Sequence, residues 1–305
     1  GKGYLPVTLV QYGRGCRFAC SFCAISTFFE RQQCVRPIRD VIAEIEAQDR
    51  RFVFFVDDNF VSDHERAKAL MRELIPLKIR WVSQGSIDMT EDPELMDLVE
   101  ASGCPGFVIG FESVEPAAVK GMRKACNRSK TFRGWDRYSR QVEILRKHHL
   151  QTWAAFTLGH DTDTVESVLE TARFAEENRF CFAAFNILMP YPGTPLYRQL
   201  DEEGRLLWGG KWWLHPDYRF NSAAFVPKLM SPDELTDAVW QCRKRWNSAR
   251  SIFNRVWDLQ THLSSPYRLG TYLVYNRLYA KEAMTKQGMF FGKFRDSITN
   301  VRAAN

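Results

Sequence analysis

Residues 15–23 read Gly15-Cys16-Arg17-Phe18-Ala19-Cys20-Ser21-Phe22-Cys23, a run that places three cysteines in the spacing C-x3-C-x2-C. Three thiolates on one tight loop can bind three irons of a cubane [4Fe–4S] cluster, which leaves the fourth iron without a protein ligand. Electron-transfer ferredoxins normally occupy all four positions with cysteine. The spacing therefore predicts a cluster whose open iron can bind a small molecule and pass it an electron.

Two other uses of these cysteines compete with a cluster. A zinc site could combine them with Cys34, but zinc sites usually consist of two separated pairs of ligands. Disulfides are disfavoured because nothing in the chain indicates secretion. The remaining cysteines stand alone in the sequence, and we expect most of them to be small buried side chains; they are Cys34, Cys104, Cys126, Cys181 and Cys242.

The composition is ordinary for a globular protein, with 45% hydrophobic and 26% charged residues among 305. No apolar run approaches the roughly 20 residues that cross a bilayer, and no signal-peptide pattern is present. Reduced cysteines and an oxygen-sensitive cluster favour the cytoplasm. The net charge of +6 is spread along the chain, so nucleic acid is not an expected partner. We interpret the basic group Arg243-Lys244-Arg245 as the solvated face of a helix.

Short apolar runs alternate with longer amphipathic ones over the first two thirds of the chain. This alternation predicts βαβ units and an α/β fold with a parallel sheet. A closed barrel of this kind needs eight strands, so six predict an open, partial (β/α)6 TIM-type barrel. The six predicted strands are residues 7–12, 51–56, 79–84, 106–111, 152–157 and 182–188.

Local signals refine this outline. Residues 51–56 are almost continuously apolar, which is typical of a strand buried on both faces. Asp92-Pro93 and Ser231-Pro232 are typical helix starts, with a capping residue followed by proline. The pattern changes after residue 195. We therefore expect a core barrel in residues 1–195 and a mostly helical C-terminal extension in residues 196–305, rich in aromatic residues that pack.

Polar residues follow the predicted strands at the end where ligands bind in parallel α/β barrels. Asp57, Asp58 and Asn59 follow the second strand, although such residues also cap turns. The fourth strand ends in Gly110-Phe111-Glu112-Ser113. Glycine lets the backbone approach a ligand, and an acid at a strand tip can accept both hydroxyls of a ribose.

Other strand ends would line the same opening. The third strand ends in Ser83 and Gln84, the fifth leads to Thr157 and His160, and the sixth leads to Met189 and Pro190. For His160 a loop or core position is at least as compatible with the sequence as a role in the site. No side chain is singled out as a catalytic acid or base.

The cysteine spacing, with the aromatic Phe22 just before the third cysteine, resembles the signature of the radical S-adenosylmethionine (SAM) enzymes. In that family the open iron binds the amino and carboxylate groups of SAM, and a polar motif after the second strand accepts hydrogen bonds from the amino group. The resemblance implies that Asp57, Asp58 and Asn59 contact SAM and that Glu112 binds its ribose. Further SAM contacts are implied at Phe22, Gln84, Gly110, Ser113 and Met189.

The resemblance also implies a reaction. A reduced [4Fe–4S] cluster on Cys16, Cys20 and Cys23 passes an electron to SAM, the S–C5′ bond breaks, and a 5′-deoxyadenosyl radical forms. A flavodoxin- or ferredoxin-type protein would supply the electron, and a small molecule would be the substrate. The barrel would hold SAM and exclude water from a reactive intermediate.

Within the superfamily, four motifs resemble the B12-binding type, which includes cobalamin-dependent methyltransferases and an anaerobic cyclase: Gly3-Tyr4-Leu5-Pro6, Asp57-Asp58-Asn59, Gly110-Phe111-Glu112-Ser113 and Pro190-Tyr191-Pro192-Gly193-Thr194. That type carries an N-terminal cobalamin domain, which we expect to precede this portion because the chain starts with Gly1. Alternatives are a cobalamin-independent radical SAM enzyme, including a methylthiotransferase-like RNA modifier, and a non-enzymatic iron–sulfur or zinc module.

Overall fold

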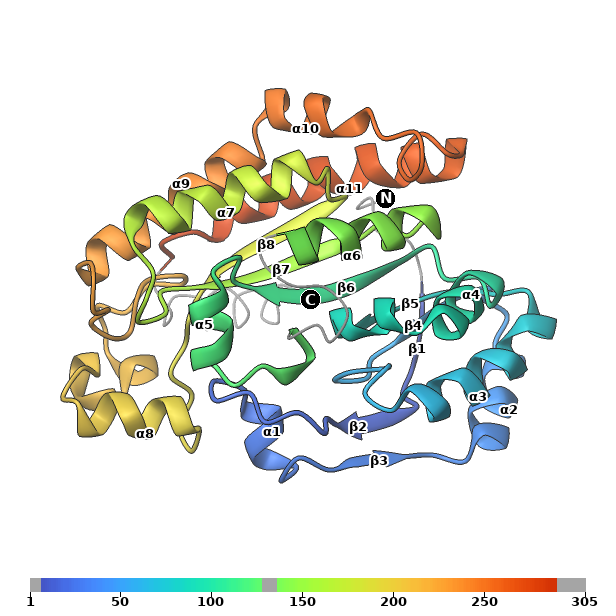
Figure 1. The fold of residues 1–305 in the computed structure, drawn as a ribbon, viewed down its shortest axis with the longest axis horizontal. Helices are drawn as coiled ribbons and strands as arrows, with labels where there is room; N and C mark the ends of the chain where they lie inside the picture. Colours follow the sequence, from blue (N-terminus) through green and yellow to red (C-terminus); the bar gives the residue numbers. More distant parts are fainter. Residues whose placement is uncertain (1–6, 128–135, 290–305) are drawn as a thin grey trace, which may run out of the picture.

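A six-stranded parallel sheet forms the centre of the molecule (Figure 1). The computed structural model describes residues 7–127 and 136–289. The spatial order follows the chain, and the two outer strands do not pair, so the predicted open, partial barrel is confirmed. The strands are β1 (Thr8–Val10), β4 (Phe52–Phe55), β5 (Arg80–Gly85), β6 (Gly106–Glu112), β7 (Trp153–Leu158) and β8 (Phe182–Ile187).

Helices follow the strands; most of them cover the convex face of the sheet, and two lie at the carboxyl ends of the strands (Figure 1). They are α2 (Ile38–Glu46), α3 (His64–Leu74), α4 (Pro93–Ala101), α5 (Pro116–Gly121), α6 (Asp136–Lys147), α7 (Val165–Glu177) and α8 (Pro195–Glu202). Short 3-10 turns complete the connections: η1 (Ile75–Leu77), η2 (Ile87–Glu91), η3 (Ala125–Asn127), η4 (Leu207–Gly210) and η5 (Trp212–Leu214). Asp92 caps α4 as predicted, accepting a hydrogen bond from Leu95 N.

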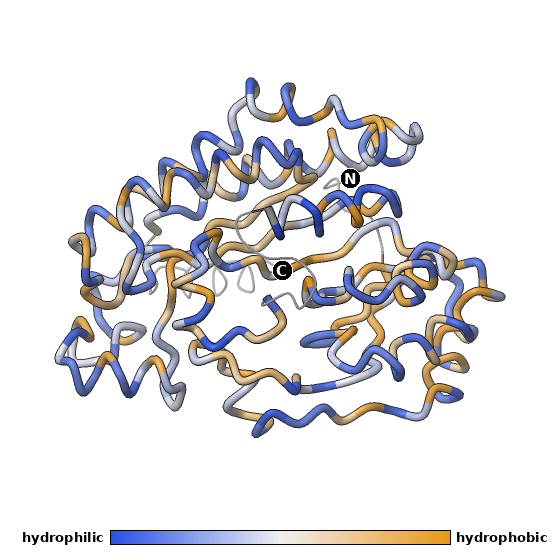
Figure 2. The backbone as a smooth tube through the Cα atoms, in the orientation of Figure 1, coloured by the Kyte–Doolittle hydropathy of each residue, from blue (hydrophilic) through white to orange (hydrophobic). Residues whose placement is uncertain are grey.

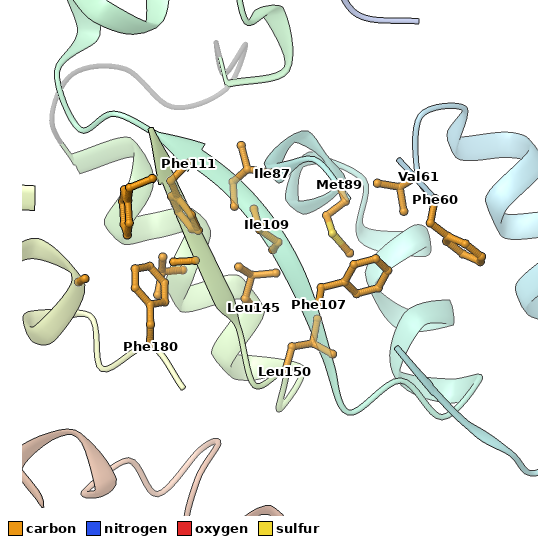
Figure 3. Close-up of a cluster of buried hydrophobic side chains, with 14 of the residues drawn as sticks. Phe60, Val61, Ile87, Met89, Phe107, Ile109, Phe111, Leu145, Leu150 and Phe180 are labelled. Atoms are coloured by element: carbon orange, nitrogen blue, oxygen red, sulfur yellow. The ribbon is translucent and has the colours of Figure 1, made fainter. Parts of the chain in front are cut away.

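The main hydrophobic core lies between the sheet and these helices. Phe107, Ile109 and Phe111 of β6 point to the same side and meet Leu145 of α6 and Ile87 of η2 (Figure 3). The strands are apolar along their length, whereas the covering helices alternate apolar and polar residues (Figure 2). Strand alternation therefore directs the other residues of β6 to the concave side of the barrel.

The concave side is only partly covered, which corrects the expectation for residues 51–56. Val53 and Phe55 are buried against the helices, but Phe52 and Phe54 are half-buried on the opposite face. Leu9 is 61% exposed. The strand is apolar on both faces. The fold fully covers only the face of Val53 and Phe55 that packs against the helices.

A small antiparallel hairpin was not predicted from the sequence. Strand β2 (Gly13–Gly15) pairs with β3 (Gln33–Val35), and the connection between them holds the three cysteines and helix α1 (Ala24–Phe28). Three-residue strands rich in glycine carry too little alternation to be recognised. The hairpin closes the cysteine loop at its base.

Three helices form the C-terminal part: α9 (Pro232–Trp246), α10 (Ala249–Val256) and α11 (Pro266–Lys286). The predicted start of α9 is confirmed, because Ser231 and Glu234 form a capping box. The interpretation of Arg243 as solvated is wrong: it is 8% exposed, and its Nε donates to Phe185 O at 2.7 Å. Lys244 and Arg245 fit that interpretation, because both are exposed, and Arg245 pairs with Glu176.

Helix α11 and helix α7 lie on opposite faces of β7 and β8. Phe174 of α7 meets Phe156, whereas Tyr279 of α11 meets Trp153 at 4.7 Å between ring centroids. Residues 153 and 156 point to opposite sides of the strand because they are an odd number apart. Among the described helices, none is long and apolar enough to span a membrane. The Gly3–Pro6 motif lies outside the described residues.

Candidate functional site

The cysteine loop lies at the carboxyl ends of the strands, where several hydrogen bonds hold it. Ser21 N donates to Met122 O after α5 at 2.9 Å, and Leu196 N of α8 donates to Ser21 O at 3.0 Å. Ser26 Oγ donates to Phe18 O at 2.8 Å. Helices α5 and α8 lie at this same end of the sheet (Figure 1). The loop conformation is therefore fixed by the barrel and by the hairpin together.

The three thiols share a partly buried environment. Burial raises the pKa of Cys20 to about 12, and the neighbouring thiols of Cys23 and Cys16 add to the rise while Lys124 opposes it. Burial also raises the pKa of Cys23. Cys20 and Cys23 therefore lose their protons only to a strongly bound cation.

Cys16 differs from the other two because polar side chains approach its sulfur. Asn59 Nδ2 lies 3.5 Å from Cys16 Sγ, and Ser62 Oγ lies 3.8 Å from it. Ser62 is fully buried and also accepts a hydrogen bond from Arg17 N. Donors to a ligating sulfur tune a metal centre. Sequence reasoning missed Ser62, whose only signal is its position three residues after Asn59.

The three residues of the Asp57-Asp58-Asn59 motif form hydrogen bonds with different groups. Asp57 is fully buried and accepts hydrogen bonds from Tyr12 N at 2.8 Å and Gly13 N at 2.7 Å, one on each oxygen. Burial raises its pKa to about 6, against the effect of these two donors. Asp58 accepts one hydrogen bond, from Gly15 N at 2.7 Å. The two carboxylates thus anchor the hairpin that carries the cysteines.

Gln84 supports the same motif rather than standing apart from it. Its side-chain Nε2 donates to the backbone oxygen of Asp57 at 2.8 Å. Its backbone carbonyl accepts a hydrogen bond from Phe60 N. Ser113 is buried, and its hydroxyl accepts from Glu115 N at the start of α5. Met189 is half-buried and packs beside Trp212. The structure gives Ser113 and Met189 local packing roles and leaves their part in ligand binding as a prediction.

Glu112 sits in a strained and crowded position at the tip of β6. Its φ angle is +64°, and the register between β6 and β7 shifts between Gly110 and Glu112. One carboxylate oxygen forms an ion pair with Lys124, and the other accepts from Thr157 Oγ1 at 2.6 Å. Burial lowers the pKa of Lys124, but the charge of the neighbouring Glu112 carboxylate raises it. The net effect is a raised pKa.

Gly110 is required here for a different reason from the one expected. A Cβ at this position would collide with Glu112 Oε1 and Lys124 Nζ, so the glycine makes room for the ion pair. Asn127 then donates to the carbonyls of Gly110 and Phe111 at the irregular part of β6. Sequence reasoning missed Lys124 and Asn127, because a buried lysine or asparagine in a loop is not distinguishable from an exposed one.

A small pocket of about 160 Å³ borders the cysteine loop. It lies between Phe22, helices α5 and α8, and the segment that follows β7. His160 lines it, is 7% exposed, and has no hydrogen-bond partner for its Nε2 among the described residues. The ring of Phe22 lies edge-on to this imidazole, with 6.5 Å between centroids. The pocket offers an apolar wall and one unsatisfied polar atom.

Within residues 7–127 and 136–289, no three His, Cys, Asp or Glu side chains are placed to hold one metal ion, and this applies equally to the cysteine triplet and to the zinc alternative. Cys34 is exposed on β3, in register with Arg14. Four isolated cysteines are buried as expected: Cys104, Cys126, Cys181 and Cys242.

Comparison with protein families finds a match to the Radical SAM superfamily over residues 10–175. Bacteriochlorophyllide d C-12(1)-methyltransferase of Chlorobaculum tepidum is 28% identical over 84% of this chain and 55% of that protein. Hopanoid C-2 methylase of Rhodopseudomonas palustris is 27% identical over 92% and 51%. The anaerobic magnesium-protoporphyrin IX monomethyl ester cyclase of Cereibacter sphaeroides is 25% identical over 82% and 40%. The chain spans about half the length of these curated relatives.

Solved structures share the fold. The cobalamin-dependent SAM radical enzyme OxsB, with aqua-cobalamin bound, superposes with a TM-score of 0.59 and 12% identity, covering 90% of this chain and 46% of that one. The radical SAM methyltransferase TsrM of Kitasatospora setae, with cobalamin and a [4Fe–4S] cluster bound, gives 0.56 and 21% identity over 65% and 37%.

Proposed function

Because this chain belongs to the radical SAM superfamily, whose enzymes use a [4Fe–4S] cluster and SAM, we propose that it is the catalytic portion of a cobalamin-dependent methyltransferase or cyclase. The observation that carries the proposal is the triplet Cys16, Cys20 and Cys23 at the carboxyl ends of a parallel sheet. The methyltransferase and cyclase relatives support the choice within the superfamily.

The residues present fit the cluster. Three soft thiol ligands lie on one fixed loop, and Cys16 receives two polar neighbours, Asn59 and Ser62. Burial raises the pKa of Cys20, so this thiol gives up its proton only where a strongly bound cation replaces it. When bound, the reduced cluster supplies the electron that cleaves SAM.

Hydrogen bonds within the protein support a choice among the candidate SAM contacts. Both oxygens of Asp57 already accept backbone donors, whereas Asp58 has an oxygen without a partner among the described residues. We therefore assign the amino group of SAM to Asp58 and Asn59. Glu112 and Thr157 would hold the ribose at the tip of β6. The pocket beside Phe22 suits a purine ring, and His160 Nε2 suits its polar edge.

Two partners complete the proposal. Cobalamin would be held by a separate domain, as the cobalamin bound in OxsB and TsrM suggests for proteins of this fold. The electron would come from a flavodoxin- or ferredoxin-type protein. Arg14 and Arg17 are exposed next to the cysteines, and Phe28 of α1 is 80% exposed. An acidic partner surface would complement this region.

The test is anaerobic reconstitution with iron and sulfide. We expect about four irons and four sulfides per chain, together with formation of 5′-deoxyadenosine or S-adenosylhomocysteine from SAM under reducing conditions. Cys20→Ala should abolish cluster loading and SAM cleavage, because two thiolates do not hold the cube.

Cys34→Ala is the matched control, since Cys34 is an exposed cysteine on the adjacent hairpin. It should load iron like the unaltered chain. Full iron content and the normal charge-transfer absorption in Cys20→Ala would contradict the assignment of the cluster to these cysteines.

A further inference from the structure

Two cavities adjoin on the concave face of the barrel, away from the cysteine loop. Their volumes are about 250 Å³ and 330 Å³. Both are lined by Trp153 of β7, Phe182 of β8 and Tyr279 of α11. We call the two together the floor groove. Each is close to the size of a small-ligand site, and the pair offers room for a larger molecule.

The floor groove is apolar over most of its length. Phe54, Val82 and Val108 form its wall on the sheet, and Tyr267 and Tyr275 form its wall on α11. The strand residues are only half-buried, although a parallel sheet normally covers such side chains. Half-buried apolar side chains on these strands keep part of their surface in water, and a ring-bearing ligand would remove that surface from water.

One end of the groove carries a buried cation. Arg243 lines the larger cavity and bonds only neutral oxygens, namely Phe185 O at 2.7 Å, Asn186 Oδ1 at 3.2 Å and Gln287 Oε1 at 2.6 Å. Glu282 and Lys286 line the same cavity, but no carboxylate of the described residues forms an ion pair with Arg243 within 4.0 Å, and burial lowers the pKa of Arg243 to about 10. A buried charge without a counter-ion is costly, and these three bonds leave two of its five N–H donors.

The groove faces the same side of the sheet as the proposed SAM site. Trp153 and Thr157 are four residues apart on β7, so they point to one face, and Thr157 bonds Glu112. Phe182 and Asn186 of β8 are related in the same way, and Asn186 lines the cavity next to Arg243. A molecule in the groove would therefore lie under the proposed ribose-binding tips.

We propose that the floor groove binds the substrate, and that this substrate is an apolar, ring-containing compound whose anionic group is bound by Arg243. The proposal rests on the proposed function only in calling the ligand a substrate. The binding site itself stands on the two cavities, their apolar walls and the unpaired guanidinium.

A pair of fluorescent probes separates the two parts of the site. 1-Anilinonaphthalene-8-sulfonate carries aromatic rings and an anion, and N-phenyl-1-naphthylamine carries the same rings without the anion. We expect saturable binding of both to the 305-residue chain, measured by fluorescence titration. Arg243→Gln should weaken binding of the sulfonate about tenfold or more and leave the neutral probe within about twofold, since hydrogen bonds to charged groups are worth that much.

Three further variants make the test specific. Thr271→Trp fills the groove from α11 and should weaken both probes about tenfold. Arg243→Lys keeps the cation and should retain sulfonate binding within a few-fold. Arg245→Gln removes the same charge from the exposed side of α9, where it pairs with Glu176, and should change neither probe. Melting temperatures establish that each variant is folded.

Equal losses of both probes in Arg243→Gln would mean that the guanidinium only supports β8, and the anion assignment would fall. Unchanged binding in Thr271→Trp would overturn the groove as the binding site. Cluster loading and SAM cleavage are measured on the unaltered chain. Their failure would remove the proposed function without affecting the probe result, so the two failures remain distinguishable.

Discussion

Glu112 shows how much a single residue contributes to the site. Its left-handed backbone conformation places the carboxylate between Lys124 and Thr157, at the irregular end of β6. Such a conformation is unfavourable for a residue with a side chain, and it persists because the surrounding contacts fix it. The ion pair and the hydroxyl hold the carboxylate in one orientation before any ligand binds.

Gly110→Ala tests this arrangement. The added methyl would collide with both members of the Glu112–Lys124 pair, so one of them must move. We expect the free energy of unfolding to fall by about 2–4 kcal/mol. We also expect SAM affinity to fall, because the proposed ribose contact loses its orientation. Denaturant titration and equilibrium SAM binding measure the two effects.

Gly121→Ala is the matched control at the end of α5. Nothing lies within 4 Å of a Cβ at that position, and its backbone does not require glycine. Stability should be unchanged or raised by up to about 1 kcal/mol. Equal stability of the Gly110→Ala and Gly121→Ala variants would contradict the packing argument for Glu112.

The Asp57-Asp58-Asn59 motif shows what the sequence reveals at this scale. The residue types and their place after a strand predict a polar site near the cysteines. Which oxygen bonds which group depends on the hairpin, and the hairpin strands β2 and β3 leave no pattern in the sequence. Asp57 therefore emerges as a positioning residue for Tyr12 and Gly13 only in three dimensions.

Among the elements, the segment between α10 and α11 determines how the last helix docks. His262 is buried there, with Nε2 at 2.8 Å from Arg179 O and Nδ1 at 3.3 Å from Thr261 Oγ1. A neutral ring satisfies both contacts by donating from Nε2 and accepting at Nδ1. Its ring also packs on Tyr272 of α11, with 4.4 Å between centroids.

This environment makes stability depend on pH. Burial lowers the pKa of His262 to about 4, well below its usual value near 6.5. Below pH 6.5 the unfolded chain takes up a proton that the native chain does not, so the folded state loses stability as pH falls toward 4. We expect the contribution of His262 to drop by about 2 kcal/mol between pH 7 and pH 5.

Denaturant titrations of the cluster-free chain at the two pH values measure this drop. His262→Gln removes the titrating ring and should reduce the pH dependence by the same amount. A pH dependence that is identical in the variant would mean that other groups cause it.

The strands were predictable and their surroundings were not. Apolar runs separated by amphipathic ones identify β4 through β8, because that alternation is local. The apolar run in residues 51–56 does not indicate that Phe54 faces a groove. The sequence around Arg243 does not indicate that this side chain lies beside β8. Both facts depend on which distant element packs there.

At the scale of the whole molecule, the open barrel has an edge that needs covering. Among the described strands, β8 pairs with β7 alone, so carbonyls along its other side lack strand partners there. Two arginines of the C-terminal helices take that place. Arg243 binds Phe185 O, and Arg255 binds Phe180 O and Cys181 O at the start of the strand. Arg255 also stacks on Trp246 at 3.5 Å.

A chain cut after residue 195 should therefore not behave as an independent domain. It would expose the β8 edge, the aromatic face of Phe185 that Trp246 covers, and the floor of the barrel. We expect residues 1–195 alone to form large oligomers, measured by size-exclusion chromatography with light scattering. Co-expression with residues 196–305 should restore a soluble complex of both pieces, because the covering contacts need no covalent link. A monomeric fragment that unfolds cooperatively would show instead that the barrel is stable without its extension, and that the arginines at β8 are dispensable for folding.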